Sequence, residues 1–320
     1  MKLSVFSVVL GSLSFQEACR FLASEGVDAV EIGCGGHPGK RHCDPKALLN
    51  NKAAQKDFLS ILSDNGLSIA ALSAHGNPVH PDAAVARGFQ EDFRDAVRLA
   101  AELGVDRVVT FSGCPGGSPE DRTPNWVTCA WPDDFQEVLG YQWDQVLIPY
   151  WQKEAAFVKA QGIEKVALEM HPGFCVYNPE TLLRLRAAAG GVIGANLDPS
   201  HLFWQGIDTP RAIQALGEAI HFFHAKDTSI DPTYNPVNGV LDYKHYSHPQ
   251  RSWVFRTVGY GHGQLTWNQI ISALRQAGYD GPVSIEHEDA LMSGREGLTK
   301  AIRFLKDVII REGAGEMYWA

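Results

Sequence analysis

Four short apolar segments of the chain each carry a residue that can bind a metal ion. "KVALEM" carries Glu169, "VIGANLD" ends at Asp198, "IHFFHAKD" includes His224 and "PVSIEHED" includes Glu286. Each segment is rich in aliphatic residues and bounded by turn or helix signals, which is typical of a buried β-strand. Because all four residues stand at the carboxyl ends of their predicted strands, we predict that they form one site.

Three carboxylates and one imidazole form a ligand set dominated by oxygen. Such a set suits Mn²⁺, Mg²⁺ or Co²⁺ better than a structural zinc ion. One carboxylate at a strand end would equally suit a surface loop or a helix cap. Three carboxylates buried together without a cation would repel one another strongly. The pattern therefore predicts one divalent metal ion.

A repeated pattern places these segments in strand–helix units. A predicted helix ends, a glycine follows, and a strand begins after an acidic or polar residue. Glycine directly after a helix favours the left-handed conformation that ends it. Repeated strand–helix units imply a parallel sheet with right-handed crossovers. The pattern occurs at Gly26, Gly66, Gly104, Gly162 and Gly278.

Eight such units closing into one barrel account for the whole chain. No Ser-rich or Pro-rich linker divides it, so we predict an α/β fold, a (β/α)8 TIM barrel, as a single domain over residues 1–320. The predicted strands are 4–10, 29–32, 68–73, 107–111, 165–169, 192–198, 220–224 and 283–286. The predicted helices are 15–24, 45–64, 86–103, 142–160, 179–188, 209–216, 267–276 and 295–311.

Two segments, 113–143 and 226–263, are longer than ordinary connections in such a barrel. Both follow strands, so both are expected on the C-terminal face, where long ordered loops form lids or substrate walls. The first loop and its helix are rich in tryptophan. We expect one of these side chains to touch substrate and the others to pack: Trp126, Trp131, Trp143 and Trp151.

The composition excludes several classes of partner. The chain is 45% hydrophobic and 20% charged, so it can bury a large core, and its net charge is −9. An acidic protein does not suit nucleic acid or an anionic membrane surface, since both require a basic face. No apolar run approaches the ~18 residues of a membrane span. The apolar start of the chain is too short for a signal peptide, and we interpret it as the first strand.

The six cysteines form no C-x-x-C pair and are too sparse for a disulfide scaffold. We expect reduced thiols in a cytoplasmic protein. Cys34, His37, His42 and Cys43 lie close together, but their spacing fits no standard zinc finger.

"DPSH" after the sixth strand and "HAKD" after the seventh, with ligands in the order Glu, Asp, His, Glu, resemble the sugar phosphate isomerase/epimerase superfamily. Its members have a xylose isomerase-like TIM barrel and include ketose 3-epimerases and inosose-metabolising enzymes. The resemblance covers nearly the whole chain. It implies that Glu169, Asp198, His224 and Glu286 hold one divalent ion, most often Mn²⁺. It also implies that Glu169 and Glu286 are the catalytic acid/base pair.

The expected reaction removes a proton from the carbon beside a sugar carbonyl. Two carboxylates can take a proton from one face of the substrate and return one on the other, and a metal ion stabilises the enediolate. His201 stands in the D-x-x-H position of the resemblance, and Glu31, at the end of a strand, is expected to contact substrate or orient a ligand. The residues expected to bind substrate are His201, Arg256, His75, His171 and Lys226.

Three other functions are compatible with parts of this pattern. The first is a lyase that removes a proton from a 3-keto-glycoside and expels the C1 substituent, as in the metal-binding subunits of C-glycoside deglycosidases, which work with a small partner subunit. The second is an apurinic-site endonuclease, which the acidic charge and the single ligand set disfavour. The third is a non-catalytic sugar-binding protein, which would not need both glutamates. We expect a sugar or glycoside substrate, and either a homo-oligomer or a small partner subunit as protein partner.

Overall fold

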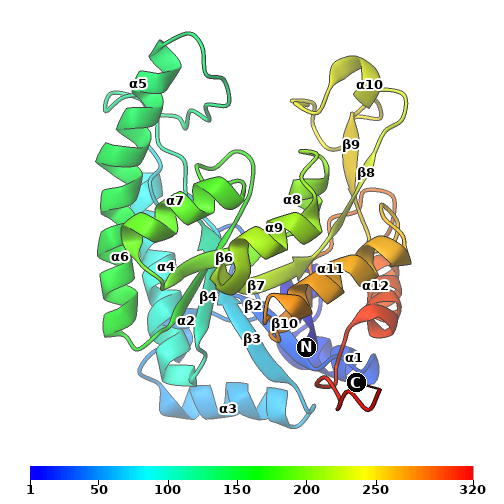
Figure 1. Ribbon diagram of the computed structural model, residues 1–320. Helices are drawn as coiled ribbons and strands as arrows, with labels where there is room; N and C mark the ends of the chain where they lie inside the picture. The colour runs from blue at the N-terminus through cyan, green and yellow to red at the C-terminus, as the bar shows by residue number, and fades with distance from the viewer. Residues whose placement is uncertain (320) are drawn as a thin grey trace.

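Eight parallel strands form a closed barrel at the centre of the computed structural model, which describes residues 1–319 (Figure 1). They are β1 (Lys2–Phe6), β2 (Ala29–Gly33), β3 (Ser68–Ser73), β4 (Arg107–Phe111), β5 (Lys165–Glu169), β6 (Ile193–Leu197), β7 (Ile220–Ala225) and β10 (Pro282–Ile285). Around the barrel they follow the order β1-β10-β7-β6-β5-β4-β3-β2. The predicted (β/α)8 TIM barrel is therefore confirmed.

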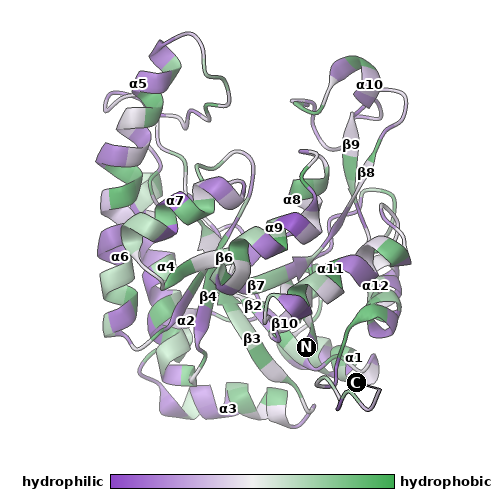
Figure 2. Ribbon diagram, in the orientation of Figure 1, coloured by the Kyte–Doolittle hydropathy of each residue, from purple (hydrophilic) through white to green (hydrophobic). Residues whose placement is uncertain are grey.

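Helices surround the barrel. Figure 2 shows apolar residues along the central strands, whereas the outer helices carry both polar and apolar residues. No helix within residues 1–319 is both long enough and apolar enough to cross a membrane. The longer helices are α1 (Phe15–Ser24), α3 (Lys52–Ser63), α4 (Ala83–Leu103), α6 (Ile148–Ala160), α7 (Pro179–Ala189), α9 (Thr209–Leu216), α11 (Gln264–Gln276) and α12 (Gly294–Val308). The short ones are α2 (Pro45–Leu48), α5 (Asp134–Gly140), α8 (Pro199–Phe203) and α10 (Asn235–Asn238).

The strands carry an apolar layer below a polar one. Ala167 of β5 and Phe222 of β7 belong to a small buried apolar cluster contributed by five of the barrel strands. Side chains two residues apart on a strand point to the same face. Glu169 and His224 therefore lie directly above this apolar layer, at the carboxyl end of the barrel. The polar side chains therefore stand on a layer of buried apolar side chains.

The first strand is shorter than predicted. It ends at Phe6, and Ser7–Leu10 form a turn of 3₁₀-helix. The apolar character that suggested a strand over 4–10 has another cause, because Val8 and Val9 line a cavity at the mouth of the barrel. A residue that lines a cavity and a residue buried in a sheet leave the same apolar signal in the sequence.

The helix predicted over 45–64 is broken into α2 and α3. Asn50 adopts a positive φ of 56°, which ends the first segment, and asparagine tolerates this conformation better than most residues. Asn51 then caps α3 by accepting a hydrogen bond from the backbone N–H of Ala54 at 3.2 Å.

The helix predicted over 142–160 begins earlier, at α5, and passes through a π-helical stretch, Tyr141–Leu147, into α6. Pro149 stands in the first turn of α6. Proline has no N–H to donate back to the preceding turn, so the local bonding pattern shifts there.

The two long loops rise as separate arms beside the mouth of the barrel (Figure 1). One arm contains α5. The other contains an antiparallel hairpin that was not predicted, β8 (Asp227–Ile230) paired with β9 (Trp253–Arg256), and α10 between them. The arms lie on the face where the predicted site is located, so their side chains are available to shape it.

Candidate metal centre and active site

The structure brings the four predicted ligands together. One ligand atom from each of Glu169, Asp198, His224 and Glu286 lies within 4.8 Å of the others, and no other such group of three or more occurs in residues 1–319. Parallel strands place their carboxyl ends side by side, which explains the convergence. Glu169 ends β5, His224 lies near the end of β7, and the other two residues directly follow β6 and β10. Their role as metal ligands remains a prediction.

The donor atoms themselves fit a cation. Nδ1 of His224 and Oδ2 of Asp198 are fully buried and have no hydrogen-bond partner. Glu31 accepts the Nε2–H of His224 at 2.9 Å, so Nδ1 of the imidazole is turned toward the carboxylates. Ser73 and Ser284 in turn donate to the two oxygens of Glu31 at 2.6 and 2.7 Å. A carboxylate that orients an imidazole in this way is typical of metal-binding histidines.

Charge at the site also favours a divalent cation. The three carboxylates of the predicted ligand set and that of Glu31 lie around one imidazole, that of His224, and one ammonium, that of Lys226. Burial by itself would lower the pKa of His224, but Glu31 and Glu286 hold it well above its usual range. The negative field that favours a proton on this imidazole also favours a metal ion.

Lys226 lies at the edge of the cluster and is almost fully buried. Its Nζ donates to Glu286 at 2.6 Å and to Glu288 at 3.0 Å, and it lies 3.2 Å from Asp198. Burial would raise the pKa of Glu286, but the Lys226 ammonium keeps it below its usual range. The structure therefore places Lys226 as a partner of two ligands, where it keeps Glu286 ionised.

Glu169 is anchored by three neighbours. His75 Nε2 lies 3.0 Å and Asn196 Nδ2 3.2 Å from Oε2, and His201 Nε2 lies 3.2 Å from Oε1. Burial opposes ionisation, but hydrogen bonds with His201, His224 and His75 keep the pKa of Glu169 well below its usual range. Asn196 was missed in the sequence, since only the barrel register shows that it points inward beside Glu169.

His171 also belongs to the site. Its ring lies 4.1 Å from that of His201, centroid to centroid. Burial lowers the pKa of His171 to about 3, so the imidazole is neutral at ordinary pH. A neutral histidine at the cavity wall can donate or accept a hydrogen bond without adding charge.

Arg256 is the one predicted substrate residue that the structure does not bring to the site. It ends β9, and its Nε donates to Asp289 at 3.1 Å. Alternate residues of a strand point to opposite faces, so Arg256 points away from the face that Trp253 and Phe255 present to a cavity. Arg251, just before β9, lines that cavity instead, and the sequence alone gave no sign of it.

Two cavities flank the four ligands. The inner cavity, of about 360 Å³, reaches Glu286 and is lined by Phe6, Val8, Val9, His37, Pro38, His75, Phe111, Glu286, His287 and Glu288. The aromatic cavity, of about 660 Å³, lies below the β8–β9 arm. It is lined by Trp126, Thr128, His171, Pro172, Gly173, His201, Trp204, Leu241, Asp242, Tyr243, Lys244, His245, Tyr246, Arg251, Trp253 and Phe255.

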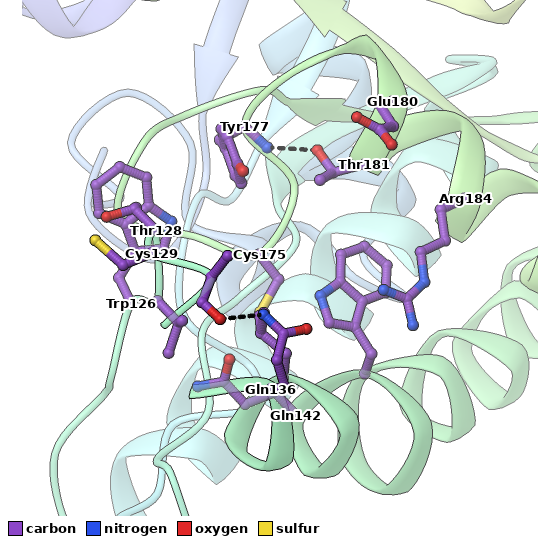
Figure 3. Close-up of a pocket in the computed structure, with 14 residues that line it drawn as sticks. Trp126, Thr128, Cys129, Gln136, Gln142, Cys175, Tyr177, Glu180, Thr181 and Arg184 are labelled. Atoms are coloured by element: carbon purple, nitrogen blue, oxygen red, sulfur yellow. Dashed lines mark hydrogen bonds between the residues drawn. The ribbon is translucent and has the colours of Figure 1, made fainter. Parts of the chain in front are cut away.

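A third cavity, of about 290 Å³, lies between the first long loop and α7. Figure 3 shows Trp126 and Cys129 of the loop on one side of the cavity and Arg184 of α7 on the other. Trp126 and Thr128 line both this cavity and the aromatic cavity. The loop therefore forms a wall shared by the two cavities.

Of the four tryptophans of the first arm and its helix, Trp126 is the one that lines the aromatic cavity. Trp143 and Trp151 are buried. The Arg184 guanidinium lies 4.2 Å from the centroid of the Trp143 ring. The Trp151 indole N–H donates to the Ser112 carbonyl at 2.9 Å. Trp131 is 78% exposed.

All six cysteines are free thiols. Cys34, His37, His42 and Cys43 do not form a metal site within the part of the chain that the structure describes. His42 instead contacts the Leu13 carbonyl at 3.1 Å.

The chain matches the family of xylose isomerase-like TIM barrels over residues 19–308. It is 39% identical to the protein YfiH of Bacillus subtilis (strain 168) over 312 residues, which are 97% of this chain and 99% of that protein. The fold resembles the IOLI protein solved with a bound zinc atom, with a TM-score of 0.66, 19% identity and coverage of 97% of this chain and 98% of that one. It also resembles D-psicose 3-epimerase, with a TM-score of 0.60, 14% identity and coverage of 97% and 99%. This chain belongs to the xylose isomerase-like TIM barrel family.

Proposed function

We propose that this protein is a divalent-metal-dependent sugar isomerase or epimerase that transfers a proton at the carbon beside a carbonyl. One observation carries the proposal: two glutamates, Glu169 and Glu286, lie 3.3 and 3.4 Å from the same Nδ1 of His224, and their surroundings hold the pKa of each below its usual range. A site that only bound sugar would not need two carboxylates held in this state.

Glu169, Asp198, His224 and Glu286 would hold the metal ion. Their oxygen-rich set supports Mn²⁺, with Mg²⁺ or Co²⁺ as substitutes. When bound, the ion would supply Lewis-acid stabilisation of the negative charge that develops on the substrate.

The chain's own groups would move the proton. Glu286 lines the inner cavity and is kept ionised by Lys226, so it can accept a proton from a sugar there. Glu169 is more deeply buried, but its partner His75 lines the same cavity. Acid/base catalysis requires such groups within hydrogen-bond reach of the reacting carbon's proton.

The test is proton NMR in D₂O with free ketoses, using Mn²⁺-loaded protein that is then exchanged into Mg²⁺ for observation. We expect deuterium at the carbon beside the carbonyl and the appearance of an epimer or of an aldose–ketose pair. Glu169→Gln and Glu286→Gln should each lower the exchange rate by about 10²-fold or more. Glu296→Gln, on the exposed face of α12, is the matched control and should exchange normally. Full exchange in either active-site variant would refute the assigned roles.

A lyase acting on 3-keto-glycosides is the second candidate, and the aromatic cavity beside His171 and His201 favours it. Removal of the C2 proton would leave a carbanion beside the carbonyl, and its electron pair would then expel the C1 substituent. The same NMR panel, extended to 3-keto-glucosides, distinguishes the two candidates. Release of the aglycone, alone or after addition of a small partner subunit, would place the lyase first.

A further inference from the structure

The aromatic cavity is too large to serve a free monosaccharide alone. Its volume is about 660 Å³, against about 360 Å³ for the inner cavity that reaches Glu286. It adjoins the proposed metal centre through His201, whose Nε2 lies 3.2 Å from Glu169. A substrate bound at the predicted ligands would enter this second space past His201.

The wall of the aromatic cavity consists of flat, mutually packed rings. Trp204 and Trp253 stack with centroids 4.6 Å apart and an angle of 6° between their planes. Phe255 packs edge-on against Trp253 at 5.2 Å, and Tyr246 stacks on Phe255 at 5.5 Å. Rings fixed in this way lose little further freedom when a ligand binds, and aromatic rings pack favourably on one another.

Two charged residues of the same wall, Arg251 and Asp242, are already bonded within the protein. Arg251 donates from Nε to the Trp253 carbonyl at 3.1 Å and from Nη1 to the Lys244 carbonyl. Asp242 accepts from Ser252 N and from Lys244 Nζ, each at 2.7 Å. A second sugar ring would lose its bonds to water here and gain none from these two charged residues without displacing their partners, whereas an aromatic ring has no such bonds to lose.

We propose that the aromatic cavity binds an aromatic ring joined to the sugar, so that the substrate belongs to the class of aryl glycosides and their keto derivatives. This inference rests on the proposed function for the position of the sugar. The ring would lie between Trp126 of the first arm and the β8–β9 aromatic residues of the second.

The test is calorimetric titration of the Mn²⁺-loaded full chain with three unreactive probes: methyl β-D-glucoside, phenyl β-D-glucoside and cellobiose. We expect the phenyl compound to bind at least about tenfold more tightly than the other two. Tyr246→Ala and Trp126→Ala, checked for folding by circular dichroism, should each remove most of this preference. Trp131→Ala replaces an exposed tryptophan of the first arm and should keep it. Equal affinity for all three probes, or a preference for cellobiose, would overturn the inference.

The binding result can be separated from the proposed reaction. Glu169→Gln should lose proton exchange yet keep the phenyl preference, because it leaves the aromatic wall intact. Exchange on free ketoses without any phenyl preference would refute the aromatic subsite and leave the reaction standing. A phenyl preference without proton exchange on any keto sugar would refute the proposed reaction and leave the aromatic subsite standing.

Discussion

Glu31 is the residue on which the orientation of His224 depends. It accepts the imidazole Nε2–H and is itself held by two serine hydroxyls. In Glu31→Gln the amide would present an N–H to one of these donors, so the imidazole would lose its fixed orientation. We expect Mn²⁺ affinity to fall by roughly 10- to 100-fold. Electron paramagnetic resonance of free Mn²⁺ measures this, with Glu296→Gln as control. Unchanged affinity in a folded variant would show that Glu31 does not orient the ligand.

Among single residues, the predicted metal ligands were easier to find in the sequence than the residues that hydrogen-bond to Glu31 and Glu169. Glu169 and Glu286 could be found because each ends or follows a strongly apolar strand. Ser73, Asn196 and Ser284 could not, since a small polar residue inside a strand gives no sign of which face it occupies. Their roles depend on the barrel register, which sets them beside Glu31 and Glu169.

A buried carboxylate at the start of β8, that of Asp227, holds the loop that follows β9. Asp227 accepts hydrogen bonds from the backbone N–H groups of Gly259 at 3.0 Å, Gly261 at 3.2 Å and His262 at 2.9 Å. A side chain at Gly261 would collide with the Thr228 carbonyl, its Cβ lying 2.2 Å away. The loop after β9 therefore fits only against this aspartate.

We predict that Asp227→Ala lowers the free energy of unfolding by about 3 kcal/mol, because several buried donors lose their acceptor. Urea denaturation monitored by circular dichroism measures the loss. Asp231→Ala is the matched control, because Asp231 bonds only to exposed or partly buried backbone of the same arm. A loss of 1 kcal/mol or less there is expected. Equal losses in the two variants would contradict the special role of Asp227.

The hairpin itself escaped prediction for a physical reason. Its strands have four residues each and are separated by 22 residues of polar and aromatic chain, as the bounds of β8 and β9 show. Neither strand has enough alternation to be distinguished from loop, and the two pair across a long connection. The helices α1 and α9, in contrast, were predicted with their observed bounds, because a cap residue and an apolar face mark each one locally.

For the whole molecule, the barrel brings like charges together at its mouth, and a bound cation should relieve their repulsion. A ligand that binds only the folded state at 100 times its dissociation constant adds about 2.7 kcal/mol of stability. We therefore expect chelation of the metal to lower the melting temperature by several degrees. Differential scanning fluorimetry with and without Mn²⁺ measures the shift. Asp198→Asn should abolish most of it, and an equal shift in that variant would place the stabilising ion elsewhere.

The barrel could be predicted from the sequence because its strand–helix units repeat the same local pattern. The bounds of most barrel strands shift by no more than two residues, with the end of β1 as the exception, since its apolar continuation lines a cavity. The two arms depend on contacts between distant segments, so their shape required the structure.

The opposite end of the barrel contains a group that should control acid stability. His221, on β7, is buried, and it faces Arg186, Lys165 and Arg107. Burial and then the Arg186 charge lower the pKa of His221 from 6.5 to about 4. The unfolded chain therefore binds a proton more readily than the folded protein between these two values.

Stability should consequently fall as the pH decreases from about 6.5 to about 4, and His221 should account for about 3 kcal/mol of that loss. His221→Gln has no imidazole to protonate at this position. Its free energy of unfolding should therefore fall less than that of the parent as the pH decreases. Urea denaturation at pH 7.5, 6, 5 and 4.5 measures the slope. His245→Gln, on the exposed part of the second arm, should retain the parent slope. A His221→Gln slope equal to that of the parent would mean that His221 is already protonated, or hydrated, in the folded barrel.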